Sequence, residues 1–185
     1  MYLDILVLVH LAHRPAHGYE IKKRVDISIG TPALNNNVLY PALRRFQEAG
    51  AIEGELVVQP GLPPRRVFHL TETGHDLLCS LIQDFPKELA GSEEEFLTRL
   101  AFFHLIAPAA RLDILTRRQH ALRRRIDHLE HMAGLSDSNE SYAARLLAFQ
   151  VRQAANELAW IGEIAADESR RLDESDSGTL KEDGS

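Results

Sequence analysis

The hydrophobic positions in the first part of the chain follow helical spacing in three short segments. Apolar residues recur three and four positions apart from Tyr2 to Leu11, and the pattern breaks at Arg14–Pro15. A second amphipathic segment runs from Tyr19 to Val25 and stops before Gly30. The third follows a run of asparagines, which are favoured helix caps, and ends at Gly50. The sequence therefore predicts three short helices in this part of the chain.

Two β-prone runs follow these helices, at Ile52–Val58 and Val67–Leu70. The loop between them is rich in proline, which suits an exposed hairpin tip better than a paired strand. Thr71 then opens another helix with apolar residues at Leu77–Leu78 and Leu81–Ile82. Three helices, a hairpin and a further helix, in this order, are typical of a winged helix-turn-helix, whose third helix can enter the major groove of DNA.

The pattern beyond Pro86 is entirely helical. Ser92 opens one helix with a capping box, Pro108 opens a longer one, and a last helix runs from about Asn139 to Arg171. The two long helices carry apolar residues at the spacing of heptad seams, and a helical pair of this size commonly buries its seams against a second copy of itself. We therefore expect a homodimer interface that contains Leu115, Leu122, Ile126, Leu129, Leu147, Val151, Leu158 and Ile161.

The predicted fold class is mainly α with a small β-hairpin. It combines a winged helix-turn-helix DNA-binding domain at residues 1–78 with a helical C-terminal dimerisation domain at residues 79–171. From Asp167 onward the chain is acidic and has almost no large apolar residues, which predicts a disordered acidic tail at residues 172–185.

Composition narrows the class of protein. The chain of 185 residues is 44% hydrophobic and 26% charged, as expected of a soluble protein of one or two domains. The most apolar stretch, Leu3–Ala12, contains Asp4 and His10 and is about half as long as the ~20 residues that a membrane span needs, so we expect no membrane partner. The single cysteine, Cys79, and the lack of a signal-peptide pattern favour a cytoplasmic location.

The charge is distributed unevenly along the chain. Residues 1–78 contain eight Lys/Arg and eight Asp/Glu, so the whole formal net charge of −6 resides in residues 79–185. An acidic total argues against strong non-specific binding to nucleic acid, but a local basic cluster in the neutral N-terminal part would be hidden in the sum.

Several short motifs in the N-terminal part appear together in a characteristic order. They are His17-Gly18-Tyr19-Glu20, then Leu39-Tyr40-Pro41-Ala42-Leu43-Arg44-Arg45, then Gly61 to Pro64 with Arg65-Arg66-Val67-Phe68, and finally Leu70-Thr71 with Gly74. Through these motifs, residues 3–78 resemble the PadR family of bacterial transcriptional regulators. The C-terminal half is similar to the dimerisation domain of the longer PadR subgroup in length and pattern alone.

The resemblance implies a homodimeric repressor-type regulator with a recognition helix at about Asn37–Ala49 and a wing at about Val57–Arg66. The residue types agree, because asparagine amides can bind base edges or phosphates, a tyrosine hydroxyl can donate to a phosphate, and arginines supply positive charge. The candidate DNA-binding residues are Asn35, Asn36, Asn37, Tyr40, Arg44, Arg45, Arg65 and Arg66. The family commonly has a small residue and Thr where this chain has Asn37-Val38, so the operator preference of relatives does not transfer.

Each of these assignments has a structural alternative. Asn37 could only cap its helix, Tyr40 could pack on the body of the domain, and one of Arg44 and Arg45 could be a solvated surface charge. Gly18 is expected to take a positive φ or to let a neighbouring helix approach closely. Tyr19 is expected to fill the core of the small domain with its hydroxyl pointing outward.

The remaining candidates concern ligands. His10, His13 and His17, and separately His128 and His131, have spacings that could place imidazoles on one face, but no companion ligand has a matching spacing, so we expect no metal site and no cofactor. Trp160 is expected at the edge of the C-terminal seam, where it would pack in the dimer or bind a planar effector.

The overall prediction is a sequence-specific transcriptional regulator, a homodimeric repressor of a DNA operator that is released by a small-molecule effector. No catalytic motif is present, so we expect no enzyme. Two alternatives stay open: the same fold with a metal or redox trigger, and a module of this fold that binds another protein instead of DNA.

Overall fold

The computed structural model describes residues 1–29, 34–58, 64–134 and 141–179. The chain forms two compact units: residues 1–84 with 97–105, and residues 85–96 with the part from residue 106 onward. The elements in chain order are α1 (Tyr2–His13), β1 (Ala16–His17), α2 (Gly18–Ile29), α3 (Asn36–Glu48), β2 (Ile52–Val57), β3 (Arg65–Leu70), α4 (Glu72–Gln83), α5 (Glu93–Ala101), the short 3-10 helix η1 (Phe103–Leu105), α6 (Pro108–Gly134) and α7 (Tyr142–Thr179).

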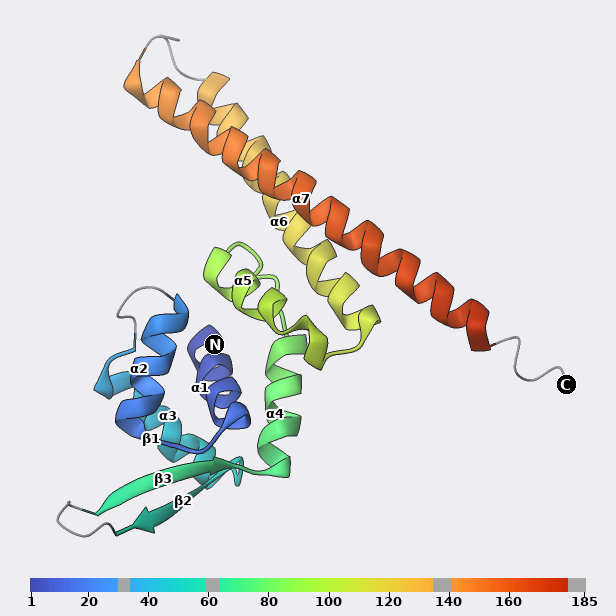
Figure 1. Ribbon diagram of the computed structural model, residues 1–185. Coiled ribbons are helices and arrows are strands. Elements are labelled where there is room, and N and C mark those ends of the chain that lie inside the picture. The colour runs from blue at the N-terminus through green and yellow to red at the C-terminus, as the bar shows by residue number, and fades with distance from the viewer. Residues whose placement is uncertain (30–33, 59–63, 135–140, 180–185) are drawn as a thin grey trace, which may run out of the picture. The chain divides into compact units, whose positions relative to one another are not determined.

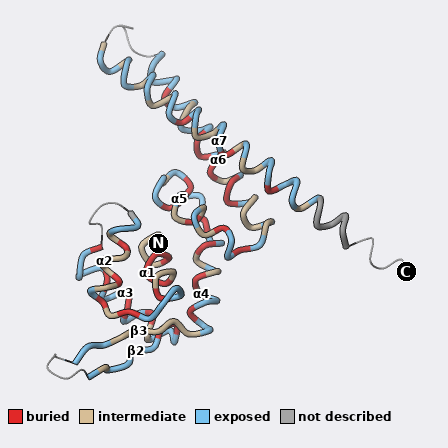
Figure 2. Tube along the Cα trace, viewed as in Figure 1, coloured by how far each residue is buried: buried red, intermediate tan, exposed pale blue. Residues whose placement is uncertain are grey.

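The first unit is built around α1, the most buried of its helices (Figures 1 and 2). α1, α2 and α3 pack against a small antiparallel sheet of order β1-β3-β2, and α4 packs against α1. β2 and β3 extend away as a hairpin (Figure 1). The predicted three helices, hairpin and fourth helix are confirmed. β1 was not predicted, because a strand of two residues shows no periodicity in the sequence. Its residues Ala16 and His17 pair with Phe68 and Val67 of β3.

Both ends of α3 are determined by local chemistry. The Asn35 side-chain oxygen accepts a hydrogen bond from the Val38 backbone N–H at 3.0 Å, so Asn35 is the residue that caps the helix. At the other end, Gly50 has φ of 67°, and the Ala51 N–H donates to the Phe46 carbonyl at 2.8 Å. This left-handed glycine with its backward hydrogen bond is the usual way to end a helix before a strand.

The start of α4 is fastened to the end of α3. The Thr71 hydroxyl donates to the Gly50 carbonyl at 2.7 Å and also caps α4 by accepting from the Gly74 N–H at 3.1 Å. A Cβ on Gly74 would lie only 2.1 Å from the Ala51 carbonyl oxygen, so glycine is required for this close approach. The hairpin is therefore held rigidly between α3 and α4.

The second unit consists of α6 and α7 packed against each other, with residues 85–96 beside α6. Its most unusual core residue is Arg118, which is 1% exposed. The Arg118 guanidinium donates to both carboxylate oxygens of Glu157 at 2.7 and 3.0 Å and to the Ala90 carbonyl at 2.9 Å. It also lies over the Phe96 ring, 5.4 Å from the centroid. One side chain thus connects α6, α7 and the segment before them.

The predicted end of the last helix is wrong. α7 continues past Arg171 to Thr179, so the first part of the predicted disordered tail at 172–185 is helical. Ion pairs one turn apart, Arg170 with Asp167 and Arg171 with Glu168, support the turn that ends at Arg171. Residues 180–185 lie outside the described residues.

The seam residues predicted for dimerisation differ in exposure within a single chain. Leu115, Leu122, Leu129 and Ile161 are buried, whereas Ile126, Leu147, Val151 and Leu158 are half-buried. α6 and α7 of the same chain pack on each other, and this accounts for the four buried positions. No helix among the described residues is long and apolar enough to cross a membrane.

Candidate functional site

The exposed face of α3 carries most of the candidate residues. Leu39, Leu43 and Phe46 anchor the opposite face in the core. At 100° per residue, this leaves Asn37, Pro41, Arg44 and Glu48 as the most outward row, with Tyr40 to one side of it and Arg45 to the other. All six of these outward side chains are exposed. The helix therefore presents polar and charged groups on a surface fixed by its own core contacts.

The arginines of this unit differ in whether they have a partner. Arg45 donates to the Asp4 carboxylate of α1 at 2.6 Å, so part of its charge is neutralised within the domain. Arg44, Arg65 and Arg66 are exposed and form no ion pair with another described residue. An exposed cation without an internal partner remains available to an external anion.

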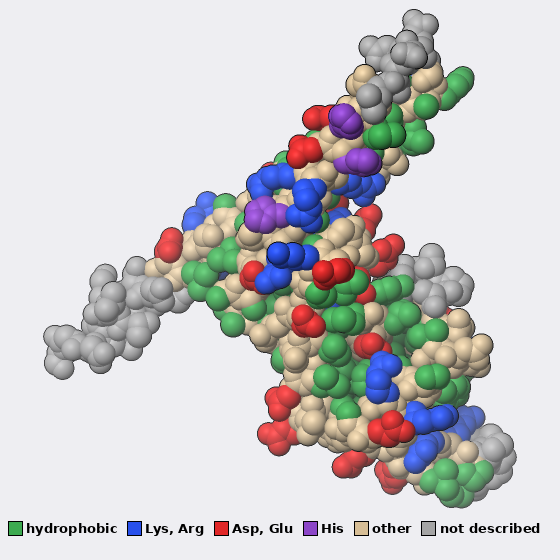
Figure 3. Space-filling model, turned by 180° about the vertical axis from the view of Figure 1, so that it is seen from behind, with side chains coloured by type: hydrophobic (Ala, Val, Ile, Leu, Met, Phe, Trp, Pro, Cys, Tyr) green, Lys and Arg blue, Asp and Glu red, His purple; other side chains and the backbone are tan. Residues whose placement is uncertain are grey.

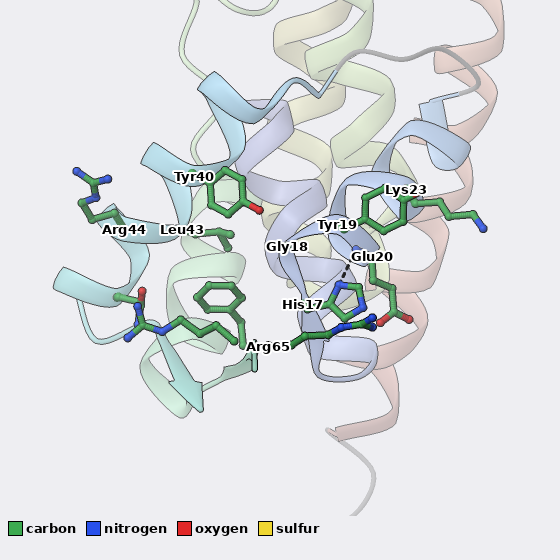
Figure 4. Close-up of a pocket in the computed structure, with 12 residues that line it drawn as sticks. His17, Gly18, Tyr19, Glu20, Lys23, Tyr40, Leu43, Arg44 and Arg65 are labelled. Carbon is green, nitrogen blue, oxygen red and sulfur yellow. Dashed lines mark hydrogen bonds between the residues drawn. The ribbon is translucent and has the colours of Figure 1, made fainter. Parts of the chain in front are cut away.

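α2, α3 and β3 enclose a hollow of about 880 Å³ on this surface (Figure 4). Leu43 and Phe68 supply its apolar floor. Its polar lining comes from His17, Tyr19, Glu20, Lys23, Tyr40, Arg44, Gln47, Arg65 and Arg66. The close-up shows Arg44 pointing away from the hollow and Arg65 on the side where His17 and Glu20 lie (Figure 4). In the space-filling view, Lys and Arg side chains also gather near the end of the hairpin (Figure 3).

Gly18 and Tyr40 meet at the centre of this hollow. A Cβ on Gly18 would lie 3.1 Å from the Tyr40 hydroxyl oxygen and 3.2 Å from Cε1, tighter than ordinary van der Waals contact. Of the two roles predicted for Gly18, close approach is confirmed, since Gly50 is the one positive-φ glycine among the described residues. Tyr40 is 49% exposed, so it combines this packing contact with an accessible hydroxyl.

The prediction for Tyr19 is wrong. Its side chain is 73% exposed and does not fill the core; the ring stacks on His17 with centroids 6.4 Å apart. Tyr19 is the second residue of α2, and the buried face of that helix is set by Ile21 and Val25 instead. Position 19 lies about 200° around the helix from position 21, so it faces away from the core.

Sequence reasoning missed Lys23 and Gln47 as lining residues of this surface. Gln47 follows Tyr40 and Arg44 at helical spacing, and that pattern could have identified it. Lys23 could not be found in this way, because its position depends on how α2 packs against α3 and β3. The predicted wing falls partly on residues 59–63, which lie outside the described residues.

Glu20 is the one carboxylate that lines the hollow. Arg24 bonds to it from the next turn of α2, and Arg14 approaches it at 3.0 Å. The hydrogen bond from Arg24, more than the nearby charges, holds the pKa of Glu20 below its usual value. Its negative charge is therefore permanent near neutral pH, but two guanidinium groups already balance it.

The second unit offers further exposed groups. Trp160 is 42% exposed and precedes the buried Ile161 on α7. Arg and His side chains gather on the rod formed by α6 and α7 (Figure 3). No group of three or more His, Cys, Asp or Glu residues in the described part of the chain is arranged to hold a metal ion.

Comparison with known proteins gives one family. Residues 7–80 match the model of the Transcriptional regulator PadR-like family. No relative is found among the curated proteins.

Several solved structures are similar to this chain. Bacillus subtilis PadR in complex with operator DNA is 19% identical, with 91% of this chain and 99% of that chain covered and a TM-score of 0.42. A PadR family transcription regulator from Clostridium difficile is 25% identical, with 57% and 99% covered and a TM-score of 0.38. One from Eggerthella lenta is 32% identical, with 40% and 64% covered and a TM-score of 0.34.

The family match covers nearly all of α1 to α4 and the sheet, which contain every residue of the hollow. α6 and α7 lie beyond it. Through residues 7–80, the chain is similar to the PadR-like family of transcriptional regulators.

Proposed function

We propose that this protein is a sequence-specific DNA-binding regulator that represses transcription as a homodimer and is released from its operator by a small-molecule effector. The observation that carries the DNA-binding part is the surface around α3: its outward row includes Arg44, and the adjoining hollow includes Arg65 and Arg66. None of these three arginines forms an ion pair with another described residue. Duplex DNA offers phosphates to the arginines and base edges in its groove to the polar side chains of α3.

The contacts divide into two kinds by position. Asn37 and Arg44, in the outward row of α3, are assigned to base edges, where asparagine suits adenine and arginine suits guanine. Tyr40, Arg65 and Arg66 are assigned to backbone phosphates.

The remaining three predicted residues contribute less. The side-chain oxygen of Asn35 already accepts the capping hydrogen bond from the Val38 N–H, so its NH2 group is the part left to contact DNA. Asn36 is exposed beside it. Arg45 contributes less than Arg44, because it is already paired with Asp4.

The dimer is proposed through the α6–α7 unit, within the predicted helical domain at 79–171. An apolar stripe on α7 supports it: Tyr142, Leu146, Phe149 and Trp160 are exposed at successive intervals of about one, one and three turns. Exposed apolar residues in register favour burial against another surface. The half-buried seam residues Ile126, Leu147, Val151 and Leu158 would complete the interface, and Trp160 is the candidate effector contact.

The test is selection of duplexes from a pool of random DNA with the full-length protein. We expect enrichment of an inverted repeat whose half-sites are about 10 base pairs apart, since a two-fold dimer presents its α3 helices to successive major grooves. A pool with no enriched sequence, and no retention of DNA at low salt, would overturn the proposal in favour of a module that binds another protein. If the free protein sedimented as a monomer, the proposed homodimer would be wrong, whereas the proposed DNA binding would stand.

A further inference from the structure

The hollow between α2, α3 and β3 has the size and the lining of a pocket for a small molecule (Figure 4). Its volume of about 880 Å³ lies within the range of about 300–1,000 Å³ that is usual for such pockets. Leu43 and Phe68 form an apolar floor, and polar and charged side chains surround it. This combination suits a ligand that has both a planar ring and negatively charged groups.

Two cations in the lining come from different elements. Lys23 of α2 and Arg65 of β3 are exposed, and neither forms an ion pair with another described residue. Glu20 does not neutralise them, because its carboxylate is already bound by Arg14 and Arg24. Positive charge from two elements is therefore left for an anionic group such as a phosphate.

Two tyrosines supply oriented aromatic rings. Tyr19 is 73% exposed, and its ring stacks on His17 at an interplanar angle of 22°. Tyr40 is 49% exposed and packs against Gly18. Both rings thus have a defined neighbour and a free surface. Exposed aromatic rings are common partners of nucleobases, which stack on them whatever the base.

A glycine of β2 makes room for two further polar groups of the lining. A Cβ on Gly54 would lie 2.7 Å from Arg66 Nε and 3.0 Å from Gln47 Nε2. Without that Cβ, the guanidinium and the amide lie together at the hollow. An amide beside a guanidinium offers an acceptor and several donors to the polar edge of a base or to ribose hydroxyls.

From these features we propose that the hollow binds a free nucleotide, a planar base joined through ribose to two or more phosphates. The base lies against Tyr19 and Tyr40, and Lys23 and Arg65 bind the phosphates. The proposal rests on the proposed function, because Tyr40 and Arg65 are assigned there to DNA phosphates. A bound nucleotide would therefore compete directly with the operator, at a site separate from Trp160 of α7.

The first experiment is calorimetric titration of the full-length protein with ADP, adenosine and pyrophosphate at constant ionic strength. ADP is expected to bind once per chain. Adenosine lacks the phosphates and pyrophosphate lacks the base, so each should bind at least about tenfold more weakly.

Variants of α2 test the assigned contacts. Lys23→Gln and Tyr19→Ala should each weaken ADP binding roughly tenfold, the first by loss of a phosphate contact and the second by loss of stacking. Lys22→Gln is the matched control and should bind ADP like wild type, because the Lys22 ammonium group donates to Asp26 at 2.7 Å. Equal urea midpoints would show that all variants fold.

The second experiment measures competition by fluorescence anisotropy. ADP should displace the enriched duplex, and the apparent dissociation constant for DNA should rise linearly with ADP concentration. Adenosine at the same concentration should have little effect.

The outcomes separate the two proposals. If the protein binds DNA but not ADP, the nucleotide site is wrong and the proposed function stands. Pyrophosphate binding as tightly as ADP would overturn the assignment of the base to the tyrosines, and ADP binding without displacement of DNA would overturn the competition. If the protein binds ADP but no DNA, the proposed function fails and the nucleotide site stands.

Discussion

Arginine is used in opposite ways in the two units. In the C-terminal unit, Arg118 is buried, and its guanidinium is bound by Glu157, the Ala90 carbonyl and the Phe96 ring. In the N-terminal unit, Arg44 and its neighbours on β3 are exposed and form no ion pair with another described residue. The first arrangement supports the fold, and the second leaves positive charge on the surface.

The difference shows why net charge was a poor guide to function. The N-terminal 78 residues carry eight basic and eight acidic residues and are neutral overall. Several of their acidic groups are used internally: Asp4 with Arg45, Asp26 with Lys22, and Glu20 with two arginines. The lining of the hollow contains Lys23, Arg44, Arg65 and Arg66 but a single carboxylate, that of Glu20, which is already paired. An anionic partner responds to this local excess of positive charge.

The largest effect is expected on stability at Arg118. Arg118→Leu should reduce the free energy of unfolding by about 3–5 kcal/mol, because it leaves the Glu157 carboxylate without its buried partner. Arg44→Leu should change it by less than about 0.5 kcal/mol. Urea denaturation measures both. Replacing Arg118 and Glu157 together by methionine should recover much of the lost stability. If Arg118→Leu and Arg44→Leu lowered the free energy of unfolding equally, the contrast between a structural and a surface arginine would be wrong.

The next effect is on DNA affinity and separates two adjacent arginines. Arg44→Ala should weaken binding to the enriched duplex by about 1–3 kcal/mol, the value of a good base contact. Arg45→Ala should cost less, since Arg45 is partly neutralised by Asp4. Anisotropy titrations at one salt concentration give both values. If Arg45→Ala weakened DNA binding more than Arg44→Ala, the ion pair with Asp4 would not reduce the contribution of Arg45, and this part of the account would be wrong.

A smaller effect distinguishes two neighbouring asparagines. Asn35→Ala should lower the free energy of unfolding by about 1 kcal/mol, because the Val38 N–H loses its cap. Asn36→Ala should leave stability within about 0.5 kcal/mol of wild type. Thermal unfolding compares the two variants, and an intact midpoint in Asn35→Ala would show that the cap is not needed.

The smallest effect depends on pH. Burial, with Arg24 and His13 as further causes, lowers the pKa of His10 below its ordinary 6.5, so the folded protein favours the neutral ring. The unfolded chain binds the proton more readily, and stability should therefore fall as the pH drops from 6.5 to the lowered pKa. His10→Gln should lack this part of the pH dependence. Parallel curves for the two proteins between pH 7.5 and 5 would contradict the assignment.

Much of the fold could be predicted, because each element has a local signal. The apolar spacing of α1, the caps at Asn35 and Thr71 and the glycine at position 50 all appear in the sequence. The end of α7 was missed, since residues 173–179 have no large apolar residue to continue the helical pattern.

The site was harder to predict, because exposure depends on packing between elements. The motif around Tyr40 and Arg44 identified the correct helix, but the sequence could not tell Arg44 from Arg45 without the position of Asp4. For the same reason Tyr19 was assigned to the core and Lys23 was overlooked, since both depend on the contact between α2 and the sheet.

The most direct test of the central claim is the salt dependence of DNA affinity. For wild type, log affinity should fall linearly with log salt. Arg65→Ala should weaken binding and flatten that slope by about 0.9, because it removes a phosphate contact, whereas Arg44→Ala should weaken binding with a smaller change of slope. Arg117→Ala on α6, where the arginine is paired with Asp113, should match wild type. Unchanged affinity and slope in both N-terminal variants would contradict the account.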